Sequence, residues 1–172
     1  MCPGHHLPAE MTVDELESHG LVRMDDAEIR GFLSTQGTGV LGLQGEAVPY
    51  LIPMSYGFDG ESLYFSYVLG AESRKAALTG EGTSARVLVY RVDTAFNWES
   101  VLVSGVVETV PEDEHESVLE TVRVAWRPEL FERAEGTETV ELYRFRVEDW
   151  TGVKHTGLPP GFEGTPPGAD AG

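Results

Sequence analysis

Apolar and polar side chains alternate along much of the chain, and this pattern predicts a mainly β protein. A period of two is typical of strands, because successive side chains of a strand point to opposite faces. Pro49 and Pro53 fall within one expected strand; proline lacks the amide donor of a ladder, so that strand should lie at a sheet edge or be bulged. Strands are expected at residues 38–43, 48–55, 62–67, 85–92, 100–110 and 140–147.

Helical signals occur between these stretches. Asp25 is a candidate N-cap with Glu28 three residues later, the pattern of a capping box, and Gly37 should end this helix. Two more short helices are expected, at 71–78 and from Pro111 toward Val124. The predicted fold is therefore mainly β (α+β), a six-stranded antiparallel split barrel with short peripheral helices.

The chain of 172 residues is long enough for one domain with a substantial core. Residues 1–21 lack sustained periodicity and are expected to form an N-terminal arm. Residues 156–172 are rich in proline and glycine and contain too little apolar surface to order themselves, so a C-terminal tail is expected. The domain should span 22–155.

Acidic residues dominate the charge, with 29 Asp and Glu against 12 Lys and Arg and a formal net charge of -17. This balance argues against binding to nucleic acid or to an anionic membrane, because both need a basic surface. Only two of the basic residues are lysine. An acidic surface that avoids lysine favours adaptation to high salt (a halophilic protein). A regulatory acidic tail is the alternative, although the acids are spread along the whole chain.

Cysteine and histidine indicate no metal site. Cys2 is the single cysteine, which excludes an internal disulfide. Cys2, His5 and His6 lie close together in the sequence and could bind a stray metal ion. This N-terminal segment is more simply explained as a flexible extension. His115, within an acidic helix, is most simply a surface residue. The N-terminus lacks the apolar core of a signal peptide, and no apolar stretch is long enough for a membrane span, so a cytoplasmic location is expected.

One cluster of positive charge follows the third expected strand. Ser73, Arg74 and Lys75 fall in the first turn of the helix expected at 71–78. A helix N-terminus offers free amide groups, and a hydroxyl with two cations there would complete a phosphate-binding site. A surface helix with a solvated arginine–lysine pair is the alternative. His155, beside Lys154 at the end of the last strand, is a candidate contact for a substrate. Motifs for a serine nucleophile, a P-loop or a Rossmann glycine turn are absent.

The motifs in this order resemble the pyridoxamine 5′-phosphate oxidase-related, FMN-binding split-barrel family, over residues 22–154. The resemblance rests on Gly-Val-Leu-Gly-Leu at 39–43, Val-Pro-Tyr-Leu-Ile-Pro-Met-Ser-Tyr at 48–56, and Tyr-Phe-Ser-Tyr at 64–67 followed by Ser-Arg-Lys. The Pro-Tyr-x-x-Pro-Met strand is similar to that of the subgroup known as nitroimidazole reductases.

The resemblance implies a set of FMN contacts. Arg74 and Lys75, assisted by Ser73, would hold the phosphate. Ser66 and Tyr67 would approach the ribityl chain or the ring edge. Ser100 takes the place of a glutamine in the family strand, which puts that contact in doubt. Trp98 and Trp150 are candidate pocket walls, with a role in the core or an interface as the alternative. Backbone groups would line the isoalloxazine at Pro53, Met54, Ser55 and Tyr56.

The resemblance also implies a homodimer that binds FMN at the subunit interface and acts as an oxidoreductase on a small organic molecule. A nicotinamide cofactor or a flavin reductase would supply the electrons. The family's C-terminal substrate-gripping arginine segment is not matched, so vitamin B6 synthesis is not expected. The alternatives are a non-catalytic flavin- or haem-binding module, a deazaflavin user, and a salt-adapted structural dimer without a cofactor.

Overall fold

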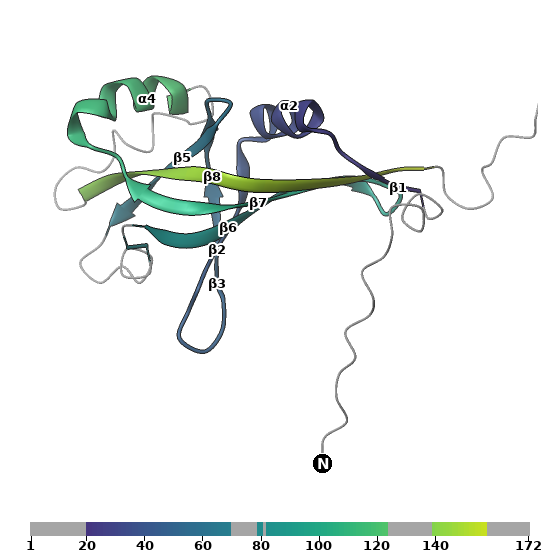
Figure 1. Cartoon of the computed structure of the whole chain (residues 1–172), viewed down its shortest axis with the longest axis horizontal. Helices are drawn as coiled ribbons and strands as arrows, with labels where there is room; N and C mark the ends of the chain where they lie inside the picture. Colours follow the sequence, from purple (N-terminus) through teal and green to yellow (C-terminus); the bar gives the residue numbers. More distant parts are fainter. Residues whose placement is uncertain (1–19, 70–78, 81, 124–138, 158–172) are drawn as a thin grey trace, which may run out of the picture.

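The structure is a computed structural model that describes residues 20–69, 79–80, 82–123 and 139–157. The phosphate-binding cluster expected at 73–75 and its helix lie outside these residues. Two α-helices, one 3₁₀ turn and eight strands form within the described ranges (Figure 1). The elements are β1 (Leu21–Arg23), α2 (Asp26–Gln36), β2 (Thr38–Leu43), β3 (Tyr50–Ser55), β4 (Gly57–Phe58), β5 (Ser62–Leu69), β6 (Thr83–Thr94), β7 (Asn97–Thr109), η1 (Glu112–Glu114), α4 (His115–Arg123) and β8 (Thr139–Thr156).

The strands form one curled antiparallel sheet in the order β3-β2-β6-β7-β8-β5-β4, with β1 paired to β8. In Figure 1, α2 and α4 lie above the long strands β7 and β8, while the β2–β3 hairpin projects below them. The six longer strands correspond to the six expected from alternation, so the split-barrel prediction is confirmed. None of the described helices is long and apolar enough to cross a membrane.

Four strands, β5, β6, β7 and β8, extend further than the alternation predicts. The segment 93–99 was expected to separate two strands, but only residues 95–96 form the turn between β6 and β7. Arg91 pairs with Glu99 across this hairpin, with 2.8 Å between Nη2 and Oε2. Polar side chains at a hairpin end thus continue the ladder rather than break it. Strand β8 likewise runs to Thr156, well past the expected end at Val147.

Helix α2 closes one end of the core. Its capping box forms as predicted: the Asp25 carboxylate accepts the Glu28 amide, and the Glu28 carboxylate accepts the Asp25 amide. Gly37 ends the helix in the left-handed conformation, with φ of 70°. The residues that α2 buries against the sheet are Ile29, Phe32 and Leu33.

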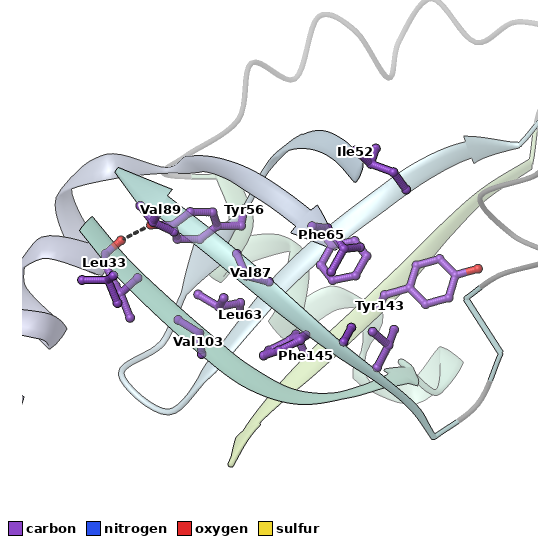
Figure 2. Packing of buried hydrophobic residues seen from close by; sticks show 14 of the residues in the cluster. Leu33, Ile52, Tyr56, Leu63, Phe65, Val87, Val89, Val103, Tyr143 and Phe145 are labelled. Atoms are coloured by element: carbon purple, nitrogen blue, oxygen red, sulfur yellow. Dashed lines mark hydrogen bonds between the residues drawn. The ribbon is translucent and has the colours of Figure 1, made fainter. Parts of the chain in front are cut away.

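The core fills the inside of the curled sheet. Figure 2 shows side chains from α2 and from most of the sheet meeting there, among them Leu33, Val87 and Phe145. Phe65 and Tyr143 stack, with ring centroids 5.6 Å apart. A smaller buried cluster lies beside α4 and consists of Tyr64, Val110, Val118 and Leu142.

A β-bulge bends β8 where it crosses the middle of β7. The register shifts between Ser104 and Gly105, so that Ser104 faces Asp149 while Gly105 faces Val147. A Cβ on Gly105 would lie 2.1 Å from the carbonyl oxygen of Arg146, well inside van der Waals contact. Glycine is therefore required for the two strands to approach this closely.

Candidate functional site

One face of the sheet is turned away from the core and is termed the outer face here. Directly paired residues of antiparallel strands point to the same side, and successive residues point to opposite sides. Val87 and Val89 are fully buried in the core. Leu88 and Tyr90 alternate with them along β6 and therefore belong to the outer face. The register then assigns the side chains of the neighbouring strands.

Three successive rows of side chains cross the outer face without a carboxylate. The first row is Pro53, Val40, Leu88, Leu102 and Thr151. The second includes Tyr90, Ser100 and Val153, and the third Val92, Trp98 and His155. In a chain with 29 acidic residues, an extended face of this kind is a strong departure from the average surface. It is the pattern of a surface that meets a partner or a ligand.

Large apolar side chains on this face are well exposed. Leu51 is 65% exposed, Tyr90 53% and Val92 61%. Single exposed apolar residues are ordinary, but these come from two strands and lie on one face with Pro53 and Leu88. The outer face therefore provides a contiguous apolar surface.

Five of the residues expected to contact the cofactor or substrate lie on this face: Pro53, Ser55, Trp98, Ser100 and His155. They come from three strands that are far apart in the sequence. Among the described residues β3 pairs only with β2, so it is the edge strand that its prolines predict. In the part of the chain that the structure describes, residues 53–55 therefore take part in no ladder on the other edge of β3, which is what binding of a ring through their backbone atoms requires.

Trp98 and His155 form the aromatic end of the outer face. They are register partners on β7 and β8, and their rings stack with centroids 6.3 Å apart and planes at 21°. Phe96 adds a third ring 6.1 Å from the imidazole. His155 Nδ1 lies 2.6 Å from the Phe96 carbonyl oxygen, which can only accept, so Nδ1 carries a proton. In the neutral ring, Nε2 is then left as an acceptor.

The other expected contacts lie elsewhere. The Tyr56 ring is buried in the core, its hydroxyl donates to the Leu33 carbonyl (2.9 Å), and its amide donates to the Gly37 carbonyl (2.9 Å). Burial raises the pKa of this phenol to about 12. Met54 packs against the same core. The side chains of these two residues thus serve the core, and the predicted contact with a ring at either position would involve backbone groups.

Ser66 has a buried hydroxyl oxygen without a hydrogen-bond partner, on the strand that also carries Tyr67. Its register partner Leu142 belongs to the small cluster beside α4, so Ser66 faces that cluster. The side chain of Tyr67 and the residues Ser73, Arg74 and Lys75 lie outside the part of the chain that the structure describes. The phosphate-binding cluster therefore stays a prediction.

Trp150 lies on the opposite side of β8 from the outer face, at a cleft of about 770 Å³ between α2, the β4–β5 turn and β8. Its indole nitrogen donates to Asp26 (3.0 Å), and the Arg30 guanidinium lies 4.7 Å from its ring centroid. The cleft also contains Arg144, whose pKa is raised chiefly by its hydrogen bond to Glu114. Trp150 is thus separated from Trp98.

Among the described residues, no three histidine, cysteine, aspartate or glutamate side chains gather to hold a metal ion. The chemistry available on these three rows of the outer face is that of aromatic and aliphatic surface, hydroxyls and one imidazole. Such a surface can hold and orient a planar ligand, while a redox reaction would need a bound cofactor to supply it.

A curled antiparallel sheet with peripheral helices and an edge strand of this kind defines a split barrel. The pyridoxamine 5′-phosphate oxidase family model matches residues 25–154. The chain therefore belongs to that family.

Similar solved structures share the fold. An FAD-binding protein from Mesorhizobium loti has a TM-score of 0.63 at 18% identity, covering 80% of this chain and 98% of its own. A conserved hypothetical protein from Mycobacterium tuberculosis has a TM-score of 0.64 at 26% sequence identity; the match covers 79% of this chain and 89% of that protein. A proposed 5-nitroimidazole antibiotic resistance protein from Bacteroides thetaiotaomicron has a TM-score of 0.57 at 16% sequence identity; the match covers 78% of this chain and 87% of that protein. No match was found among curated proteins.

Sequence reasoning missed the continuity of the outer face. Its signal was present in residues 87–90, Val-Leu-Val-Tyr, where apolar side chains occupy both faces of one strand. Apolar side chains on both faces of one strand indicate a second apolar surface in addition to the core. Reading that run as simple alternation concealed the second surface.

Proposed function

We propose that the chain binds a flavin nucleotide, FMN by preference, on the outer face between two copies of itself, and that it acts as a flavin-dependent oxidoreductase on a small organic molecule. The observation that carries this proposal is the convergence of Pro53, Ser100 and Trp98 on three neighbouring rows of the outer face that are mostly apolar and contain no carboxylate. Membership of the pyridoxamine 5′-phosphate oxidase family and the FAD-binding protein among the similar structures support a flavin as the ligand.

The residues of the face fit the parts of a flavin. The free edge of β3 would meet the polar edge of the isoalloxazine through backbone groups at residues 53–55. Trp98 and Tyr90 offer flat aromatic surface, and Ser100 offers a hydroxyl between them in the register. Arg74 and Lys75 would hold the phosphate. Once bound, the flavin supplies the redox chemistry; the protein binds it, orients it and excludes water.

His155 would contact the small-molecule substrate from the aromatic end of the face. Its protonated Nδ1 is held by the Phe96 carbonyl, and its stacking on Trp98 fixes the ring plane. Nε2 of the neutral ring would therefore present an acceptor in a fixed direction. The imidazole orients a substrate and needs no transfer of a proton.

Titration with FMN tests the flavin proposal. Quenching of FMN fluorescence should give saturable binding, and the double variant Arg74→Ala/Lys75→Ala should weaken binding at least a hundredfold, since charge-assisted hydrogen bonds contribute about 1.5–3 kcal/mol each. The control is Arg91→Ala/Arg146→Ala, which removes the same charge from two ion-paired arginines. Equal weakening in both double variants would remove the phosphate assignment, and unquenched fluorescence in the wild type would refute the proposal.

The dimer is tested by placing a charge on the outer face. Leu88→Glu puts a carboxylate at the centre of the apolar rows, where burial against a second copy would leave it unpaired. Sedimentation should show a dimer for the wild type and a monomer for this variant, with flavin binding lost together with the dimer. Leu119→Glu on α4 is the control, because Leu119 is similarly exposed (41% against 36%) and lies off this face. Dimers that persist in Leu88→Glu would contradict the interface.

A further inference from the structure

The outer face contains a groove of about 480 Å³ at the end of the sheet away from Trp98. Arg86 lies in it on β6, with Gly42 beside it on β2 and Ser104 beside it on β7. Arg86 precedes Val92, the register partner of Trp98, by six residues, which is about 20 Å along a strand. The groove is thus a separate place from the aromatic end of the face.

Arg86 differs from most basic side chains that the structure describes. Arg91, Arg144, Arg146 and Lys154 each form an ion pair with a carboxylate. Arg86 is exposed and forms no ion pair or hydrogen bond with any described residue. In a chain with so many acids, its guanidinium has five donors available to a molecule from outside.

The groove holds one carboxylate that can compete for Arg86, that of Glu148. Its Oε1 lies 3.6 Å from Nη1 of Arg146, which also pairs with Glu108, so this exposed pair offsets part of the negative charge. The remaining walls include Pro49 and Leu51, which are apolar. A ligand here would meet the guanidinium of Arg86, the partly offset carboxylate of Glu148 and walls that are otherwise uncharged.

Gly42 keeps the floor of the groove open. A Cβ on Gly42 would meet only Cδ2 of Leu51 at 3.4 Å and the Arg86 carbonyl oxygen at 3.6 Å, which are ordinary contacts. Packing within the chain therefore leaves room for a side chain at this position. Its absence leaves a flat surface between Leu51 and Arg86 on which a ring can lie.

We propose that this groove binds a small aromatic carboxylate. The carboxylate would pair with the guanidinium of Arg86, whose planar fork of donors matches two carboxylate oxygens. The ring would lie over Gly42 against Leu51 and Pro49. This site is independent of the proposed flavin site and gives the outer face a second ligand.

Titration of the full-length protein with benzoate tests the site. The backbone amide resonances of Gly42, Arg86 and Ser104 should shift saturably, with any bound flavin left in place and followed by its absorbance. Benzyl alcohol has the ring without the charge, and inorganic phosphate has the charge without the ring; both should bind at least about tenfold more weakly than benzoate.

Two variants separate the parts of the site. Arg86→Ala should weaken benzoate binding at least about tenfold, whereas Arg23→Ala, which removes another exposed arginine from β1, should bind like the wild type. Gly42→Val should block binding while leaving Arg86 in place, with a melting temperature close to that of the wild type.

Each other outcome overturns the proposal. Shifts that do not saturate, or equal losses in Arg86→Ala and Arg23→Ala, would show a general charge effect. Phosphate binding as tight as benzoate would show a contact for any anion. Unchanged benzoate binding in Arg86→Ala with a weakened dimer would show that Arg86 pairs with a second copy of the chain. Flavin absorbance is measured separately, so loss of flavin and loss of benzoate binding remain distinguishable.

Discussion

The hydroxyl of Tyr56 is held in the core by its hydrogen bond to the Leu33 carbonyl (Figure 2). Tyr56→Phe leaves that carbonyl unsatisfied and should cost roughly 1–3 kcal/mol of unfolding free energy at pH 8. The folded pKa is about 12 against the ordinary 10.0, so the unfolded chain ionises first. Wild-type stability should therefore fall between pH 10 and 12, and the gap to Tyr56→Phe should close, as measured by urea unfolding. A gap that stays constant would contradict this role.

Asp59 organises the β4–β5 turn. Its carboxylate accepts the amides of Ser62 (2.7 Å) and Glu61 (2.8 Å) and the Tyr64 hydroxyl (2.8 Å). Burial raises the pKa of Asp59, but these hydrogen bonds outweigh it and lower the pKa below the ordinary 3.8. The stabilisation is present above that value and is lost as the pH falls through the folded pKa. Asp59→Asn should lower stability at pH 7 and flatten the acid limb of a pH–stability curve; an unchanged acid limb would refute it.

At the scale of elements, replacing two different glycines by alanine should change the stability of the fold in opposite directions. Gly105→Ala places a Cβ 2.1 Å from the Arg146 carbonyl and should destabilise the bulge by about 1–3 kcal/mol. Gly31 lies on the exposed side of α2, where a Cβ meets nothing within 4 Å. Gly31→Ala should stabilise the helix by about 0.5–1 kcal/mol, since alanine is the better helix former. Thermal unfolding of both variants measures the pair, and a stable Gly105→Ala would contradict the bulge.

The elements also show what the sequence could predict. Alternation located the six longer strands, and Asp25, Glu28 and Gly37 located α2, because these signals are local. The regular alternation ends at Val147 because two consecutive acids, Glu148 and Asp149, follow it; these lie at a bulge that only pairing with β7 creates. The family resemblance indicated Ser100 and Trp98. The groove at Arg86 depends on the register of five strands, which no local pattern contains.

The whole molecule carries a net charge of -17, which opposes compaction at low ionic strength. Salt shortens the range of this repulsion from about 10 Å at 0.1 M to about 3 Å at 1 M. The described ion pairs are mostly exposed and contribute little to stability, so screening them costs less than the relief of the repulsion gains. The melting temperature should rise between 0.1 M and 2 M KCl. A melting temperature that falls over this range would contradict adaptation to salt.

The central claim is that two copies of this split barrel hold a flavin on their outer faces. The absorption spectrum of the full-length protein, purified in high salt, tests it most directly, together with identification of any small molecule released on denaturation. The account predicts yellow protein with flavin bands and the release of FMN. Colourless protein that binds no added flavin would contradict it, as would a haem spectrum with no flavin released.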